Sequence, residues 1–226
     1  PQFTSHTSYY NLLEILTHLW HSEKVFNMKR LLIILILMLS FQTLSKADDI
    51  SDFQVEGISI GDSVLDYMSK SEIKKKIKST KNHYKYLKKP TKYREVYIFQ
   101  PNDFKTYQIA SLMFKQNDNN YRIALVRGMK DYIEDLNGCF SQLNEIAKEI
   151  ETSISNFTKD VREGKSKLDK SGKSISYNTY YTLSSGDAIM LTCNNWDEKL
   201  RKKNNWTEGL SVIVRTKEVG NWLQGN

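Results

Sequence analysis

Alternating apolar and polar residues predict two groups of β-strands along this chain. The strand-like runs cover residues 95–100, 105–115, 121–126, 177–183, 188–193 and 209–216. Short polar turns at 117–120 and 184–187 join neighbouring runs, and strands joined by such turns pair antiparallel. Two longer polar stretches, 163–174 and 194–205, are expected to be loops. The pattern therefore predicts one curved antiparallel sheet of about six strands.

A long helix is predicted between the two strand groups, over residues 136–161. Apolar residues recur there at steps of three and four, which is the period of one helix face. They are Leu136, Phe140, Leu143, Ile146, Ile150, Ile154, Phe157 and Val161. Shorter helices are predicted on both sides of Ser69, which has capping-box spacing to Glu72, and over residues 218–224. We expect the α+β class, with a long central helix and short terminal helices on one face of the sheet.

Residues 28–47 have the three-part pattern of a secretory leader. A positive start precedes an apolar run at 31–39 and a more polar segment that ends at Ala47. The apolar run is too short for a membrane span of about 20 residues. We therefore expect cleavage after Ala47, a periplasmic or secreted protein without a transmembrane anchor, and one domain over 48–226. Residues 1–27 are then expected to be an upstream, non-native extension.

Two cysteines, Cys139 and Cys193, are expected to form a disulfide. An exported protein meets an oxidising environment. Cys139 lies on the apolar stripe of the long helix, and Cys193 shares a strand face with Ile189 and Leu191, so both sulfurs should face one core. Two buried free thiols are the alternative. The cysteines lack zinc-site spacing and His83 is the one histidine in 48–226, so we expect no metal or cofactor.

Residues 70–94 are rich in lysine and contain Tyr84, Tyr86 and Tyr93, within a chain of formal net charge +7. Such a segment could contact an anionic surface. The candidate contacts are Lys74, Lys75, Lys76, Lys81, Lys85, Lys88 and Lys89. In the alternative, the tyrosines pack into the core and the lysines are only solvated. The partner expected for an exported protein is an anionic envelope surface or another envelope protein, and nucleic acid is disfavoured.

A second candidate for binding is the polar loop around Trp196. Asn194, Asn195 and Asp197 surround this tryptophan, and Trp206 follows nearby. An apolar ring together with amide and carboxylate groups has the composition of a sugar-binding loop. The alternative is a tryptophan that folds back onto the core.

Signals for catalysis are weak in this sequence. Residues 171–174 read Ser-Gly-Lys-Ser, like the end of a phosphate-binding loop, but Lys167 stands where that motif needs its first glycine. His83 has no evident partner that would orient it as a general base. We therefore expect a non-enzymatic binding or envelope-interaction domain. The alternative is a periplasmic hydrolase whose site cannot be recognised from the sequence.

Five segments of the chain resemble a group of small exported proteins of unknown function from marine alphaproteobacteria. They are residues 56–73, Gly138-Cys139, 169–174, 185–196 and 210–223. The resemblance covers most of residues 48–223 and implies a periplasmic setting, but no activity or site residue. At the level of fold the chain also resembles the two-layer helix-and-sheet modules of outer-membrane assembly lipoproteins and secreted lactamase inhibitors.

Overall fold

The computed structural model describes residues 49–99, 104–166 and 169–225. These residues belong to one compact unit, Lys46–Asn226. The expected leader at 28–47 and the expected extension at 1–27 lie outside the described residues. No helix in the described ranges has both the length and the apolar character needed to cross a membrane.

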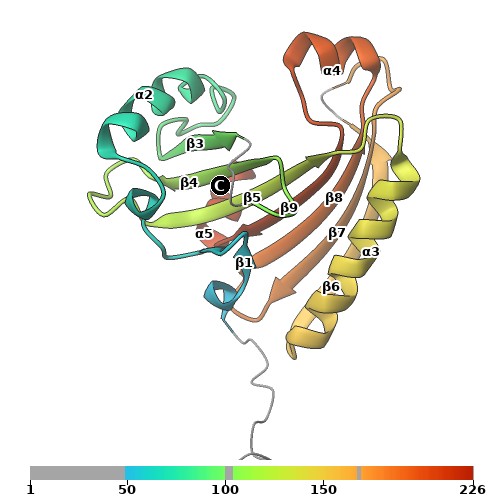
Figure 1. Cartoon of the computed structure of the whole chain (residues 1–226), viewed down its shortest axis with the longest axis horizontal. Helices are drawn as coiled ribbons and strands as arrows, with labels where there is room; N and C mark the ends of the chain where they lie inside the picture. The colour runs from blue at the N-terminus through green and yellow to red at the C-terminus, as the bar shows by residue number, and fades with distance from the viewer. Residues whose placement is uncertain (1–48, 100–103, 167–168, 226) are drawn as a thin grey trace, which may run out of the picture. The chain divides into compact units, whose positions relative to one another are not determined.

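The main element of the fold is an open sheet whose strands all pair antiparallel, with helices around it (Figure 1). The elements are β1 (Gln54–Val55), β2 (Ile58–Ser59), α2 (Lys70–Thr80), β3 (Tyr93–Phe99), β4 (Ile109–Lys115), β5 (Ile123–Asp131), α3 (Leu136–Ser153), β6 (Phe157–Lys165), β7 (Ile175–Leu183), β8 (Ala188–Asn195), α4 (Glu198–Asn204), β9 (Gly209–Arg215) and α5 (Lys217–Leu223). The large sheet has seven strands in the order β3-β4-β5-β9-β8-β7-β6, and β1 pairs with β2 separately. The α+β class and the antiparallel pairing are confirmed.

The sheet gains a seventh strand where the sequence pattern predicts the end of the long helix. The helix α3 ends at Ser153, Ile154 is extended, and β6 then pairs with β7 along its whole length. The helical period is misleading here because Phe157 and Val161 are four residues apart, a spacing that suits one face of a helix and also one face of a strand. Gly164 further disfavours a helix.

The helices α3 and α5 cover opposite faces of the sheet. Cys139, Leu143 and Ile150 of α3 pack in one hydrophobic core against Leu191 and Val212. A second core consists of Leu87, Tyr93, Met113, Leu125, Ile213, Val219 and Trp222, the last two from α5. Because neighbouring strand residues such as 212 and 213 point to opposite faces, the two cores lie on opposite sides of the sheet. The expectation that all helices lie on one face is therefore wrong for α5.

The expected disulfide between Cys139 and Cys193 is present. It joins α3 to β8 inside the first core, where both cysteines are fully buried and their Cα atoms are 6.1 Å apart. Asp135 caps the same end of α3 by accepting a hydrogen bond from the Gly138 N–H at 2.9 Å. The alternative of two free thiols is excluded.

Two shorter helices stand away from the centre of the sheet. Figure 1 shows α2 beside β3 and α4 beyond the ends of β8 and β9. The expected capping box of Ser69 and Glu72 starts α2. The sequence pattern predicts a loop over residues 194–205, but they contain α4, which begins after Asp197 and ends at Asn204. The residue that follows, Asn205, adopts the left-handed conformation that Asn tolerates. With seven residues, most of them charged, α4 shows no apolar period in the sequence.

Candidate functional site

A cleft of about 610 Å³ opens on the sheet and is lined by residues of α2 and by residues in and beside α4. Its floor includes Arg127 and Met129 of β5 and Ser211 of β9. Arg127 lies opposite Ile213 in the β5–β9 register, and Ile213 belongs to the core under α5. Residues paired across strands share a face, so the cleft lies on the same face of the sheet as α5.

The first wall of the cleft is built by α2 and β3. Lys76 Nζ donates to the Tyr97 carbonyl at 2.8 Å, and Thr80 Oγ1 donates to the Glu95 carbonyl at 2.7 Å. These bonds cover the outer edge of β3, which is an edge strand of the sheet. The rings of Tyr97 and Phe99 stack with centroids 5.8 Å apart, and Phe99 is 63% exposed. This wall therefore offers an apolar ring surface.

The opposite wall carries a second aromatic pair, from the segments that flank α4. The rings of Trp196 and Trp206 are 4.7 Å apart and inclined by 50°. Trp196 Nε1 donates to the Thr207 carbonyl at 3.0 Å, which fixes the orientation of its ring. Both tryptophans are only partly buried and line the cleft.

Contacts from the middle and from the start of α4 hold this wall in place. In the middle of the helix, Arg201 forms an ion pair with the buried Glu208, just before β9, at 2.9 Å. At the start, the Asp197 N–H donates to Ser174 Oγ at 2.8 Å, and that hydroxyl donates to Asp169 at 2.7 Å. The position of α4 therefore depends on the loop that precedes β7.

That loop contains the sequence that resembles a phosphate-binding motif. The Asp169 carboxylate accepts hydrogen bonds from the N–H groups of Ser171, Lys173 and Ser174 at 2.8, 3.1 and 2.8 Å. Bonds from Ser171 and Ser174 hold the pKa of Asp169 far below its ordinary value. In a phosphate-binding loop such amides would face the ligand. Here the chain's own carboxylate occupies them, so the loop supports α4 and offers no nucleotide site.

A buried carboxylate, Glu95, lies behind the first wall and contacts His83. Its Oε2 is 3.1 Å from His83 Nδ1 and accepts from the Tyr84 hydroxyl at 3.0 Å, while its Oε1 accepts from Ser111 Oγ at 2.6 Å. Burial alone would raise the pKa of Glu95, but the bonds from His83, Ser111 and Tyr84 and the charge of Arg127 outweigh it, so that this pKa lies below its ordinary value. His83 thus has the orienting partner that sequence reasoning did not find.

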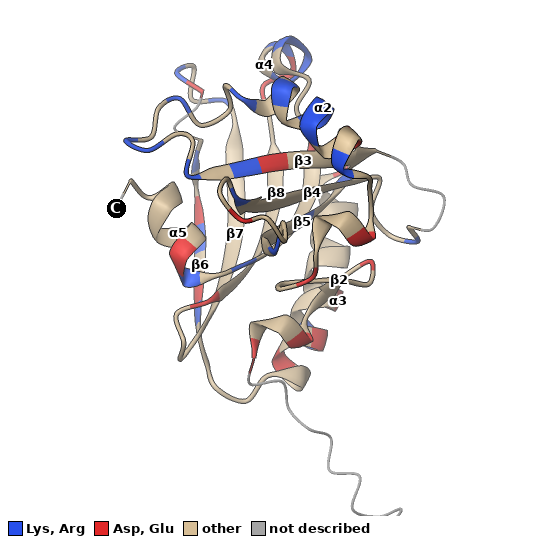
Figure 2. Cartoon of the chain, turned by 90° about the vertical axis from the view of Figure 1, so that its left-hand side faces the viewer, with Lys and Arg blue, Asp and Glu red and all other residues tan. Residues whose placement is uncertain are grey.

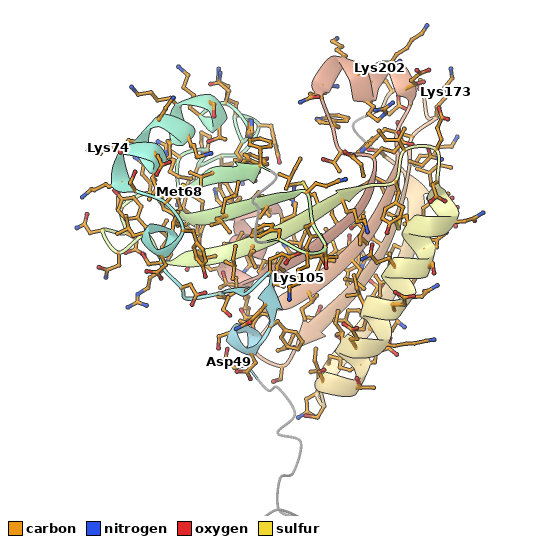
Figure 3. All side chains as sticks on the ribbon, in the orientation of Figure 1. Asp49, Met68, Lys74, Lys105, Lys173 and Lys202 are labelled. Atoms are coloured by element: carbon orange, nitrogen blue, oxygen red, sulfur yellow. A yellow bond between two sulfur atoms is a disulfide. The ribbon has the colours of Figure 1, made fainter. Side chains whose placement is uncertain are left out.

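The structure places the lysines of the basic segment in different settings. Lys74 and Lys75 are exposed on α2, and Lys81 and Lys85 are exposed on the turn that follows, whereas Lys76 lines the cleft. Figure 3 shows Lys74 on the outer side of α2, and Figure 2 shows basic residues on α2 and again on α4. Contact of these lysines with an anionic surface stays a prediction.

The last two lysines of that set lie elsewhere. Lys88 and Lys89 border a separate hollow of about 590 Å³, together with Lys92, Lys115 and Glu218. Glu218 is 3.3 Å from Lys92 Nζ and 2.7 Å from Lys115 Nζ, so its single negative charge is shared between these two cations. This hollow therefore carries its own counter-charge.

The tyrosines of the basic segment divide between the two alternatives. Tyr84 and Tyr93 pack against Trp222, each with ring centroids 5.0 Å apart, and so belong to the second core. Tyr86 is 74% exposed and does not line the cleft.

Of the residues proposed for sugar contact, the structure places Trp196 and Asn194 in the cleft. Asn194 Oδ1 accepts from Ser176 Oγ at 2.7 Å, which leaves its amide N–H groups for a ligand. Asn195 and Asp197 are not among the described residues that line the cleft. Instead, Asp197 caps α4 by accepting from the Leu200 N–H at 3.2 Å.

Sequence reasoning missed the other half of the cleft. Tyr97, Phe99 and Arg127 lie on β3 and β5, where their side chains alternate with buried apolar residues. The available signal was strand alternation: Tyr97 and Phe99 are two residues apart on β3 and therefore share a face, as do Arg127 and Met129 on β5. Nothing in the sequence shows that this side is open.

A second hollow, of about 390 Å³, lies on the opposite face of the sheet beside α3. Its floor is apolar, with Ile189 and Val212, and Glu56, Glu145 and Glu149 give it an acidic border. The described part of the chain contains no group of three or more His, Cys, Asp or Glu residues that could hold a metal ion. The cleft between α2 and α4 is therefore the best candidate for a functional site.

Comparison with known proteins gives no match to a protein-family model, no similar curated protein and no similar solved structure.

Proposed function

We propose that this chain is an exported, non-enzymatic binding protein whose cleft holds a ring-bearing ligand, namely a carbohydrate. The single observation that carries the proposal is an aromatic pair on each wall of the cleft, Tyr97 with Phe99 and Trp196 with Trp206. Binding pockets combine apolar and aromatic walls with a few polar groups that fix the ligand's orientation. Here the polar groups include the amide of Asn194 and the hydroxyl of Ser211.

Two features of the chain support the proposed compartment. The leader pattern at 28–47 favours export, and the buried Cys139–Cys193 disulfide is typical of proteins in an oxidising environment. A periplasmic or secreted binding protein meets the glycans of cell surfaces and of the medium. The proposed resemblance to small exported proteins agrees with this setting.

Calorimetric titration against a panel of neutral and acidic oligosaccharides tests the proposal. We expect at least one member of the panel to bind, and Trp206→Ala and Phe99→Ala each to weaken that binding by about 10-fold or more, since an aromatic contact is worth about 1–3 kcal/mol. Tyr86→Ala is the matched control, because it removes an exposed ring outside the cleft. Equal losses in all three variants, or no binding across the panel, would contradict the proposal.

A hydrolase is the second candidate, and the His83–Glu95 pair is the observation that favours it. A carboxylate on Nδ1 orients an imidazole and leaves Nε2 for proton transfer. The cleft also contains Ser79 and Ser211, although no hydrogen bond joins either hydroxyl to His83 among the described residues.

Incubation of the bound oligosaccharide with the protein separates the two functions. A binding protein leaves the sugar intact, and His83→Gln changes its affinity only a few-fold. A hydrolase releases shorter products, and His83→Gln abolishes their release. Chromatography of the sugar after overnight incubation distinguishes these outcomes.

A further inference from the structure

The floor of the cleft holds a cation that the protein itself does not satisfy. Arg127 stands on β5 between Ser111 of β4 and Ile213 of β9, and its guanidinium lines the cleft. Its Nε is buried and donates no hydrogen bond within the described part of the chain. Arg127 also forms no ion pair with a described residue. A buried donor without a partner is costly, so an arginine in this state indicates an acceptor that arrives from outside.

The nearest buried carboxylate, Glu95, cannot supply that acceptor. Both of its oxygens are occupied, Oε1 by Ser111 and Oε2 by His83 and Tyr84. Its charge acts on Arg127 only at longer range, since the two side chains do not come within ion-pair distance. Arg127 therefore remains available for a ligand at the bottom of the cleft.

The border of the cleft also carries a positive charge, because Lys76 Nζ lies 5.9 Å from the centroid of the Phe99 ring on the first wall. The described residues that line the cleft include no Asp or Glu. The hollow beside α3 has the opposite character, with Glu145 and Glu149 at its border. An anionic ligand would thus be drawn to the cleft and repelled from the other hollow.

We propose that the ligand of the cleft is an acidic carbohydrate, whose carboxylate binds Arg127 while its sugar rings lie between the two aromatic walls. This inference rests on the proposed carbohydrate-binding function and adds the charge of the ligand. A guanidinium matches a carboxylate through two parallel N–H···O bonds, and each such charge-assisted bond is stronger than a neutral one. A nucleic acid would require a track of cations for successive phosphates, whereas the cleft offers Arg127 and Lys76 and otherwise rings, amides and hydroxyls.

Paired ligands give the most direct test of this inference. Each uronic-acid oligosaccharide of the panel is compared with its carboxyl-reduced counterpart, which has the same linkages and rings but no charge. We expect the wild-type protein to prefer the acidic member by about 10-fold or more, and Arg127→Gln to lose that preference. Arg162→Gln is the matched control, because it removes an exposed arginine on β6, outside the cleft.

The stability of the ligand-free variant separates a binding role from a structural one. Arg127 forms no hydrogen bond or ion pair with the described residues and acts on Glu95 only through its charge at longer range, so Arg127→Gln should lower the melting temperature by no more than about 5 °C. If that variant fails to fold, Lys76→Gln provides the second test and should weaken acidic ligands more than neutral ones.

The outcomes are distinguishable. Equal binding of acidic and neutral members by the wild-type protein overturns the inference about charge but leaves the carbohydrate-binding function standing. Binding of no member overturns both. Tighter binding of single-stranded oligothymidylate than of any uronic-acid oligosaccharide would overturn the choice of carbohydrate as the anionic ligand.

Discussion

At the scale of single residues, the first wall of the cleft depends on one buried charge. Glu95 is 2% exposed and receives hydrogen bonds from Ser111 and Tyr84, while His83 Nδ1 lies beside its second oxygen. These contacts link the turn after α2 to β3 and β4. Burial and the charge of Glu95 also raise the pKa values of the Tyr84 and Tyr97 hydroxyls, which therefore stay neutral donors at ordinary pH.

Glu95→Gln should destabilise the protein at neutral pH by about 2 kcal/mol, because neutral hydrogen bonds replace charge-assisted ones. The folded state lowers the pKa of Glu95 from about 4.5, so the charge stabilises above that pH and the contribution is lost as the pH falls through the lower, folded-state pKa. The difference in the free energy of unfolding between wild type and variant should therefore become smaller at acid pH. Urea unfolding at neutral and acid pH measures it, and a pH-independent difference would contradict this role.

Some contacts between residues can be predicted from the sequence, and others cannot. The pairing of Cys139 with Cys193 follows from two periods, one helical and one strand-like, that turn both sulfurs to the same core. The contact of His83 with Glu95 follows from no period, because it depends on where the turn after α2 places the ring. Local pattern therefore predicts which face a side chain occupies, but not which polar group it meets there.

At the scale of elements, the sequence indicates most strands and misses two elements for physical reasons. Residues 157–165 continue the helical spacing of α3 by coincidence, yet they pair with β7 as an edge strand with mostly exposed side chains. The helix α4 has no buried residue, so no apolar stripe marks it in the sequence. Its stability comes from contacts outside its own segment, with Asp169, Ser174 and Glu208.

Asp169→Ala should loosen α4 without unfolding the domain. The change removes the acceptor for the N–H groups of Ser171 and Ser174 and for the Ser174 hydroxyl that supports the Asp197 N–H. We expect faster amide hydrogen exchange in α4 and unchanged exchange in α3. Asp160→Ala, on the exposed strand β6, is the control. Unchanged exchange in α4 would show that the loop does not hold this wall.

The disulfide is the strongest link between α3 and the sheet. It bridges a sequence separation of 54, so its loss should cost about 4 kcal/mol, less any strain. The double variant Cys139→Ser/Cys193→Ser should therefore melt roughly 10 °C lower than the oxidised wild type. Thermal unfolding with and without reductant checks this. A reductant should affect the wild type and leave the variant unchanged, and equal responses would refute the assignment.

At the scale of the whole molecule, the cleft joins parts of the chain that lie far apart in the sequence. One wall comes from residues 76–99, the floor includes residues from β4, β5 and β9, and the other wall comes from residues 194–207. The sequence places Trp196 and Asn194 together, but it cannot place Arg127 or Phe99 beside them. That requires the strand order of the sheet, in which β9 pairs with both β5 and β8.

Export of the chain is testable by mass. When residues 28–226 are expressed in a bacterial host, we expect the protein recovered outside the cytoplasm to begin at Asp48, because the leader pattern ends at Ala47. Intact-mass spectrometry measures the new N-terminus. The variant Ala47→Arg should block cleavage at this site, and a recovered protein that retains residues 28–47 would contradict the proposal.

The most direct test of ligand binding in the cleft follows the tryptophan indole N–H signals by NMR during titration with the best-binding acidic oligosaccharide. Residues 48–226 contain three tryptophans. Trp196 and Trp206 line the cleft, whereas Trp222 belongs to α5 and is buried, and its Nε1 donates to the Lys89 carbonyl at 2.8 Å. We expect the signals of Trp196 and Trp206 to shift with the ligand while that of Trp222 stays in place. Shifts at Trp222 alone, or at none of the three despite binding, would contradict this expectation.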